Sequence, residues 1–379
     1  MNKEVLSDRQ IVPIIVMFLL GSLLLIDVEY FARQDSWIAV LLGAVAIVPI
    51  YLIFVRLAVL YPGMHLFEMT DEVFPPFVSR SITVLFSIYA YFTGAFVVRI
   101  NSEFIHTVAF PETPPWASLI MMGLTIIYSS KIGMEVLGRW SQFFIYPVLL
   151  ILLTVSALAM TNANVNHLRP VLGSGFKPVM DEALLRIFYP FGEIIILMYA
   201  LTFSNERNKP KRTFFIGLLI GCFMIVLIKV RNLLVLGPEM VEQLYFPSYN
   251  LVGLIEIGRF IQRIESSVTI AFFAVGFVKT TVCVIAALRG MQHIFRLDHY
   301  RSVTAPFCLL FIVLCENLFK NLAEVIEFIN FYYPFIAVPF QLFLPVSLWI
   351  GAEVKHRKKN ASENPAQPPP MPPYTETSS

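Results

Sequence analysis

The sequence has 379 residues; 57% of them are hydrophobic, only 14% are charged, and the mean hydropathy is +0.71. Soluble domains carry about 25% charged residues, so this composition excludes a soluble enzyme or a soluble binding domain. It indicates a polytopic protein whose surroundings are membrane lipid. The formal net charge of +2 is too small to favour a nucleic-acid partner.

Ten segments are long and apolar enough to cross a bilayer as helices, which takes roughly 17–25 mainly apolar residues. Strand-like alternation is absent, so a membrane β-barrel fits poorly. The predicted fold is an all-α polytopic membrane domain over residues 1–353. Its ten predicted transmembrane helices are residues 10–31, 36–57, 78–102, 113–131, 139–161, 180–203, 213–234, 265–290, 302–321 and 329–352.

Residues 354–379 form a second predicted region, a basic cluster followed by a proline-rich stretch. Such a composition cannot bury apolar surface, so we expect a disordered tail. Placing the N-terminus in the cytoplasm puts most of the 28 lysine and arginine residues on the cytoplasmic side. Because the number of spans is even, both termini are then predicted to be cytoplasmic.

The sixth predicted span is interrupted by Tyr189, Pro190, Phe191, Gly192 and Glu193. Pro190 cannot donate a backbone hydrogen bond and Gly192 tolerates non-helical torsions, so the helix is predicted to break here. Broken backbone at membrane depth is tolerated where it lines a cavity or pathway enclosed by protein. The break therefore predicts a ligand site that includes Tyr189, Phe191 and Gly192.

A weaker break signal, Gly21-Ser22 followed by Leu23, lies near the middle of the first span. Ten helices divide into five plus five, and an odd number per half predicts an inverted repeat with broken helices 1 and 6. Interrupted spans in corresponding positions point to a transporter-type binding site. The alternative for Gly21 and Ser22 is close packing between helices, which small residues allow.

Two broken helices would present backbone groups of both signs at mid-membrane. Half-helices that start near Leu23 and Gly192 would offer N–H groups and a positive dipole end. The halves that end near Leu20 and Tyr189 would offer carbonyl groups and a negative end. This arrangement favours a zwitterion, and a free amino acid is the ligand that we predict.

Glu193 and Lys279 are the two ionisable residues inside apolar spans that we single out, because charges there are costly and face a cavity or a partner. Glu193 is either a hydrogen-bonded structural acid or a proton carrier. Lys279, in the eighth span, is a tethered cation in the place of a coupling sodium ion, half of an ion pair with Glu193 or Glu316, or a side chain that extends to the membrane interface.

Other residues are weaker candidates. Tyr91 in the third span is favoured for the pocket, whereas Tyr89 is expected to pack, and Thr280 follows Lys279 in the eighth span. The four cysteines lie in apolar spans without metal-ligand spacing, which predicts packing. No catalytic grouping, cofactor motif or metal cluster is visible, so we predict no enzyme activity, no cofactor and no metal.

Three sequence stretches together resemble the spore germination permease family. They are FYPFGE at residues 188–193, LRPVLGSG at 168–175, and FIQRIE at 260–265 with FVK at 277–279. The family comprises the B subunits of nutrient germinant receptors in endospore-forming bacteria and is a branch of the amino acid–polyamine–organocation superfamily. The resemblance covers residues 7 to about 353. This chain departs from it after the helix-1 break, where relatives commonly carry a second glycine and a proline.

The resemblance implies a ten-helix subunit of the spore inner membrane. It would bind a small nutrient such as an amino acid and trigger germination with a membrane-anchored A subunit and a lipoprotein C subunit. Two alternatives are an autonomous proton-coupled amino acid transporter and a scaffold that binds no ligand. The ligand contacts that the family implies are Gly21, Ser22, Tyr91, Phe191, Gly192, Lys279 and Thr280.

Overall fold

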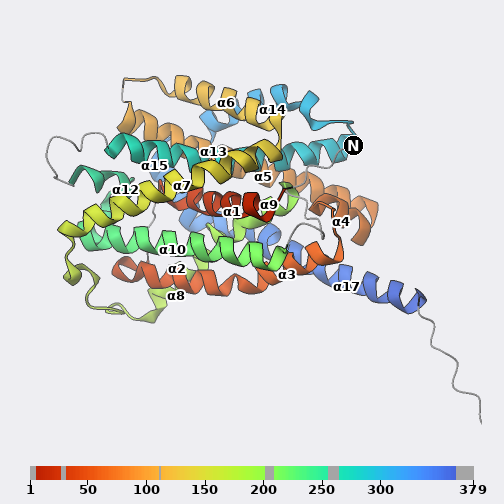
Figure 1. Ribbon diagram of the computed structural model, residues 1–379, viewed down its shortest axis with the longest axis horizontal. Coiled ribbons are helices and arrows are strands. Elements are labelled where there is room, and N and C mark those ends of the chain that lie inside the picture. The colour runs from red at the N-terminus through yellow and green to blue at the C-terminus, as the bar shows by residue number, and fades with distance from the viewer. Residues whose placement is uncertain (1–5, 27–30, 111, 201–208, 255–263, 364–379) are drawn as a thin grey trace, which may run out of the picture.

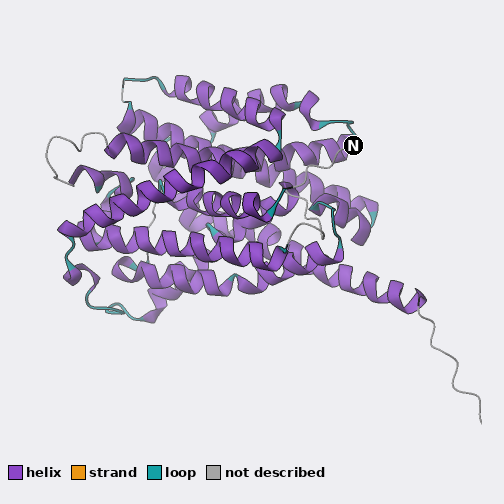
Figure 2. Cartoon of the chain, in the orientation of Figure 1, coloured by secondary structure: helices purple, strands orange, loops and turns teal. Residues whose placement is uncertain are grey.

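The computed structural model describes residues 6–26, 31–110, 112–200, 209–254 and 264–363. All regular elements within these residues are helical, and none of them is a strand (Figures 1 and 2). The α-helices are α1 (Asp8–Leu23), α2 (Ser36–Ala46), α3 (Val48–Leu60), α4 (Leu66–Val73), α5 (Pro76–Phe104), α6 (Pro115–Ile132), α7 (Met134–Ala159), α8 (Phe176–Phe188), α9 (Ile195–Ala200), α10 (Pro210–Leu236), α11 (Pro238–Gln243), α12 (Pro247–Asn250), α13 (Ile264–Phe295), α14 (Thr304–Asn317), α15 (Leu322–Glu327), α16 (Tyr333–Val338) and α17 (Leu344–Glu363).

Most of the long helices lie side by side along the long axis of the molecule (Figure 1). α13 packs against α5, α1, α7 and α9, and α1 also packs against α10. α2 packs against α8, and α6 pairs with α14. α1 and α13 are the helices that the others surround, because apolar residues cover almost their whole circumference.

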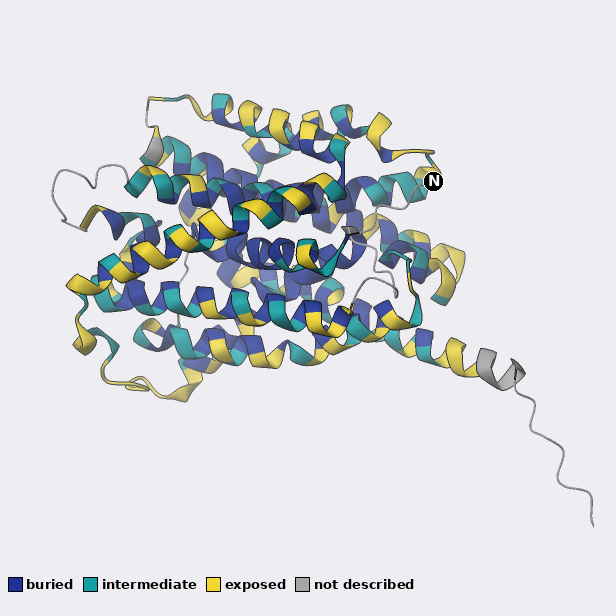
Figure 3. Cartoon of the chain, viewed as in Figure 1, coloured by how far each residue is buried: buried dark blue, intermediate teal, exposed yellow. Residues whose placement is uncertain are grey.

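The burial pattern is that of a protein in an apolar solvent (Figure 3). Large apolar side chains cover much of the outside, whereas several ionisable and amide side chains lie buried within the bundle. Bilayer cannot hydrogen-bond polar groups, so a membrane protein places them inside. Examples of the exposed apolar residues are Met121, Phe143, Tyr146, Leu310 and Phe335.

Among the described residues, six helical segments are long and apolar enough to cross a membrane. They are Arg33–Leu60, Pro76–Val108, Met134–Asn162, Pro210–Leu236, Ile264–Phe295 and Leu322–Lys358. The other predicted spans coincide with α1, α6, α14 and the α8–α9 region, which are shorter, interrupted or less apolar. The all-helical fold is confirmed, while the count of ten crossings and the inverted repeat remain predictions.

Two boundaries differ from the predicted ones. The first helix ends at Leu23 and is followed by a turn, so the half-helix expected to start near Leu23 is not found up to Ile26, and residues 27–30 lie outside the described part. The apolar run stops there because Asp27 and Glu29 follow in the sequence. At the other end α17 continues through Glu363, since the basic cluster after residue 353 forms helix readily.

A fully buried ion pair lies in α8. Arg186 Nη2 donates to Glu182 Oε1 over 2.7 Å, and the backbone N–H of Ala32 donates to Glu182 Oε2 over 3.0 Å. Gly43 of α2 leaves the room for this pair, because a Cβ there would lie 2.7 Å from Arg186 Cβ. The pair thus joins α8 to α2 and to the segment that leads into α2.

Replacing Arg186 by Met should lower the stability of the purified protein by about 3–5 kcal/mol, because Glu182 would remain buried with less compensation. The exposed pair of Arg139 and Glu135 (3.5 Å) is the matched control, and Arg139→Met should cost about 0–1 kcal/mol. Denaturation in mixed micelles measures both changes. Equal losses for the two variants would contradict the structural role of the buried pair.

Candidate functional site

The interruption predicted in the sixth span is confirmed. α8 ends at Phe188, the Tyr189–Pro190 peptide bond is cis, and the chain resumes as a 3-10 turn over Phe191–Ile194 that leads into α9. The break follows from Pro190, which cannot continue the hydrogen-bond ladder of α8. Glu193 thereby comes to lie in the first turn of a new helical segment at the centre of the bundle.

Glu193 is held by three side chains from three different helices. Lys279 Nζ donates to Glu193 Oε2 over 2.6 Å, Ser22 Oγ donates to the same oxygen over 2.7 Å, and Tyr333 OH donates to Oε1 over 2.6 Å. Lys279 Nζ also contacts Ser22 Oγ. All four side chains are buried. We call these four residues, with Tyr189, the Glu193 centre.

The helix ends around the Glu193 centre favour its charges. Ser22 belongs to the last turn of α1, where the dipole is negative, so the Lys279 ammonium is stabilised there. Glu193 lies at the start of the segment that leads into α9, where the dipole is positive. Tyr189 OH donates to the carbonyl oxygen of Ser22, and the Lys279 ammonium lies 5.2 Å from the ring centre of Phe18.

Gly21 acts here through packing. A Cβ at Gly21 would lie 2.9 Å from the carbonyl oxygen of Val275 and 3.0 Å from Lys279 Cβ. The absent side chain lets α1 and α13 approach closely, so that the stem of Lys279 runs along Gly21 and its ammonium reaches Ser22. Of the two partners considered for Lys279, the structure pairs it with Glu193.

Sequence reasoning missed Tyr333 and Gln341 in the last span. Gln341 Nε2 donates to Tyr89 OH over 2.7 Å, and Tyr89 OH lies 3.0 Å from Tyr333 OH. Because Tyr333 donates its hydrogen to Glu193, Tyr89 is the donor in the pair of phenols. The result is a directed chain of hydrogen bonds from Gln341 to Glu193. A buried amide in an apolar span was the available signal.

Two π-helical turns, Phe328–Tyr332 and Pro339–Phe343, flank α16. Each inserts an extra residue into the helical repeat, which changes the face on which later residues lie. These turns bring both Tyr333 and Gln341 to the Glu193 centre. Gln341 Oε1 has no partner among the described residues, and a Cβ at Gly192 would lie 2.0 Å from it.

Three other predicted site residues, Phe191, Thr280 and Leu23, make no hydrogen bond with Glu193. Phe191 is buried, and its carbonyl oxygen accepts from Tyr51 OH over 3.3 Å. Thr280 Oγ1 is buried with no described partner. Leu23 lines a small void between α1 and α10, whose other lining residues are Leu20, Leu24, Ile225, Ile228 and Lys229.

Tyr91 is placed away from the Glu193 centre, contrary to the preference inferred from the sequence. Its hydroxyl donates to the carbonyl oxygen of Phe307 over 3.0 Å, and its ring packs on Phe311 of α14. Tyr89 takes the inward position instead. Tyr89 and Tyr91 are two residues apart on one helix, which turns by about 100° per residue. Their rings therefore point to nearly opposite sides, and only one of them can face the centre.

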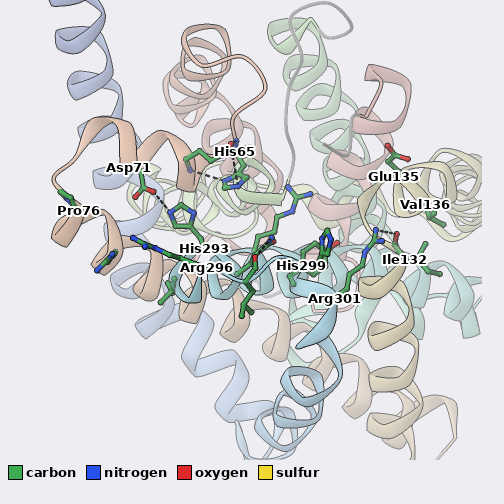
Figure 4. A pocket seen from close by; sticks show the side chains of 17 residues that line it. His65, Asp71, Pro76, Ile132, Glu135, Val136, His293, Arg296, His299 and Arg301 are labelled. Carbon is green, nitrogen blue, oxygen red and sulfur yellow. Dashed lines mark hydrogen bonds and ion pairs between the residues drawn. The ribbon is translucent and has the colours of Figure 1, made fainter. Parts of the chain in front are cut away.

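The Glu193 centre is closed. A cavity of about 1060 Å³ lies at one end of the bundle, between α4, the end of α13 and the junction of α6 and α7 (Figure 4). His65, Asp71, His293, Arg296 and Arg301 are among the residues that line it, and none of the residues of the Glu193 centre does. Chemically, the centre is a desolvated ion pair with both charges hydrogen-bonded.

The fold is that of a membrane transporter. The crystal structure of MhsT in complex with L-phenylalanine, a LeuT-fold transporter, superposes with a TM-score of 0.62, covering 93% of this chain and 99% of that chain. The sequence identity is 11%, so this likeness concerns the fold alone.

The model of the spore germination protein family matches residues 5–321, and the chain belongs to this family. Spore germination protein KB of Bacillus subtilis (strain 168) is 26% identical over 96% of this chain and 98% of its own length. Spore germination protein YndE of the same organism is 26% identical over 85% of this chain and 89% of its own length.

Replacing Tyr333 by Phe should lower stability by about 1–3 kcal/mol, because Glu193 loses a donor and Tyr89 loses its acceptor inside the bundle. Its neighbour Tyr332 is exposed, so Tyr332→Phe is the matched control and should change stability little. Thermal unfolding of the purified variants in detergent measures both. A loss in the control as large as in Tyr333→Phe would argue against the hydrogen-bond chain.

Proposed function

We propose that this chain is the nutrient-binding membrane subunit of a spore germinant receptor. It binds a small nutrient, an amino acid, at the Glu193 centre and triggers germination with an A subunit and a lipoprotein C subunit. The observation that carries the proposal is a buried carboxylate, Glu193, that already holds an ammonium group between the end of α1 and the break that precedes α9.

An amino acid fits this centre because it carries one charge of each sign. Its ammonium takes the place of the Lys279 ammonium on Glu193, and its carboxylate pairs with the displaced Lys279. The first N–H groups of the turn Phe191–Ile194, which have no partner within their own helix, give the carboxylate further donors. The buried charge stays balanced throughout, so binding avoids the cost of a lone buried ion.

The side chain of the nutrient would be read by the groups beyond the ion pair. Tyr89 and Gln341 supply hydroxyl and amide groups there. Thr280, next to Lys279 in α13, has a buried hydroxyl with no partner among the described residues. Buried polar groups left unpaired select strongly for ligands that pair them. This arrangement supports a nutrient whose side chain reaches toward α5 and α16.

Binding requires the bundle to open, because the Glu193 centre is closed. A ligand shifts a conformational equilibrium only through its differential affinity for the two states. We propose that the nutrient favours a state closed over it and that the partner subunits detect this state. The proposal places the chain in the spore inner membrane with ten crossings, a five-plus-five inverted repeat and both termini in the cytoplasm.

Spores that carry Gly192→Leu should lose the response to nutrient, because a side chain there collides with Gln341 and with the carbonyl oxygen of Ile187 at 2.7 Å. Germination is followed as the loss of spore optical density after addition of individual L-amino acids. Gly192→Ala, with only one added carbon, should show a smaller but definite loss.

Gly253→Leu is the matched control, since a Cβ at Gly253 meets only Glu265 Oε1 at 3.6 Å. Immunoblots of spore membranes establish that each variant is present at the wild-type level. If Gly192→Leu spores with normal protein levels germinate as fast as the wild type, the Glu193 centre is not the nutrient site.

A second function, autonomous proton-coupled amino acid transport, is favoured by one observation, the buried titratable Glu193 hydrogen-bonded to Tyr333 and Lys279. It predicts that the purified chain alone, in liposomes, accumulates radiolabelled L-amino acids when a pH gradient is imposed. Glu193→Gln should abolish the accumulation. Binding without accumulation in wild-type liposomes would leave the sensor as the function.

A further inference from the structure

The cavity of Figure 4, called the end cavity from here on, carries more positive than negative groups. Four arginines and three carboxylates line it, and each of the carboxylates has a partner within the protein. The contacts are those of Asp71 with His293 over 2.7 Å, of Glu68 with the backbone N–H of His65 over 3.0 Å, and of Glu135 with Arg139 at 3.5 Å. None of these contacts involves Arg80 or Arg296, which also line the end cavity.

These two arginines have no partner in the part of the chain that the structure describes. Arg80 of α5 and Arg296, which follows α13, are exposed and make no hydrogen bond or ion pair with any described residue. Figure 4 shows Arg296 on the side of the end cavity where Pro76, the first residue of α5, and His293 lie. Guanidinium groups on a concave wall attract anions and bind the oxygens of phosphate or carboxylate groups in pairs. This side of the end cavity is therefore suited to an anion.

The backbone at Arg296 is held in the left-handed region, with φ at +52°. α13 ends at Phe295, and the N–H group of Leu297 donates to the carbonyl oxygen of Gln292 over 3.0 Å. A helix that ends with this bond usually has glycine at the position of Arg296, because a Cβ is disfavoured there. The side-chain amide of Gln292 also donates to the carbonyl oxygen of Leu297 over 3.2 Å, which fixes the chain. An arginine in such a strained and fixed position points to a role for its side chain.

Arg80 lies at the edge of the apolar surface that α5 presents to the surroundings. With 3.6 residues per turn, Thr83 lies to one side of Arg80, and Phe77, Val84 and Ile88 lie to the other. Thr83 is buried in the bundle, whereas Phe77, Val84 and Ile88 are exposed. An exposed apolar strip thus runs along α5 away from the end cavity. A ligand with an anionic head and an apolar tail can contact the arginines and this strip together.

We propose that the end cavity binds the headgroup of an anionic phospholipid. Arg80 and Arg296 bind its phosphate oxygens, and an acyl chain lies along the exposed apolar strip of α5. The positive end of the α5 dipole, which begins at Pro76 on the wall of the end cavity, adds to the attraction.

The apolar strip is the reason to favour a lipid over a soluble phosphate ester. Both would pair with the arginines, but only a lipid also covers apolar surface beside them. Basic pockets between transmembrane helices bind such headgroups in membrane proteins. The site shares no residue with the Glu193 centre, and the inference does not depend on the proposed function.

The test measures lipid binding to the purified full-length chain in micelles of a neutral detergent. Dioleoyl phosphatidylglycerol or dioleoyl phosphatidylcholine is added in increasing amounts, and native mass spectrometry gives the fraction of chains that hold one lipid. The wild type should bind the anionic lipid at least about tenfold more tightly than the zwitterionic one, because each basic group near a headgroup contributes to the affinity. No nutrient is added, so failure of the nutrient site would not affect the result.

The double variant Arg80→Gln, Arg296→Gln should lose this preference. Arg296→Gly should lose most of it as well, although its unfolding temperature in lipid-free micelles should not fall, because glycine adopts the left-handed conformation without strain. A purely structural role of Arg296 would not separate binding from stability in this way. The matched control is Lys211→Gln, Arg212→Gln, which removes two exposed cations of α10 that lie outside the end cavity and should keep the preference.

A last arm distinguishes the lipid from its soluble headgroup. Glycerol phosphate at the same concentration as phosphatidylglycerol should not displace it, because it lacks the acyl chains. Equal displacement would assign the end cavity to soluble phosphate esters and overturn the lipid. Equal binding of the two lipids by the wild type, an unchanged preference in the arginine double variant, or an equal loss in the lysine–arginine control would also overturn the proposal.

Discussion

The ion pair between Glu193 and Lys279 is the constraint around which this bundle is built. Two charges buried together are tolerated only when each is paired and hydrogen-bonded. Meeting that condition takes the end of α1, the break before α9, the middle of α13 and the start of α16. The four segments are far apart in the sequence, so the pair specifies how they come together.

The same condition supports the proposed role of the centre in a nutrient sensor. Glu193 already pairs with the ammonium group of Lys279. The ammonium group of a ligand could pair with Glu193 in the same place, with little change in the total buried charge. Exchange between the two cations alters which helices are tied to one another. Pairing with Lys279 links the α8–α9 break to α13, and a free ligand would loosen that link. Under the proposed function, this change is what the partner subunits detect.

The sequence predicted features whose cause is local. The break at Pro190 and Gly192 depends on the residues at the break itself, and it appears where expected. The sequence offered Glu193 and Glu316 as ion-pair partners of Lys279. A charge is costly at membrane depth and therefore needs a partner, but this cost does not determine which residue the partner is. The family predicted from the motifs is confirmed by the match over residues 5–321.

What the sequence did not reveal depends on register and on long-range packing. The π-helical turns around α16 shift which residues face inward, so Tyr333 and Gln341 were missed. The choice of Tyr89 over Tyr91 depends on how α5 is rotated against α14, which no local pattern encodes. The end of α1 at Leu23 likewise depends on Tyr189, whose hydroxyl binds the carbonyl group of Ser22.

An unbroken α13 joins these elements to the cavity, because Lys279 and His293 both belong to this one continuous helix. A tilt of α13 that begins at the Glu193 centre must therefore reappear, as in a lever, among the charged side chains at the far end of the bundle.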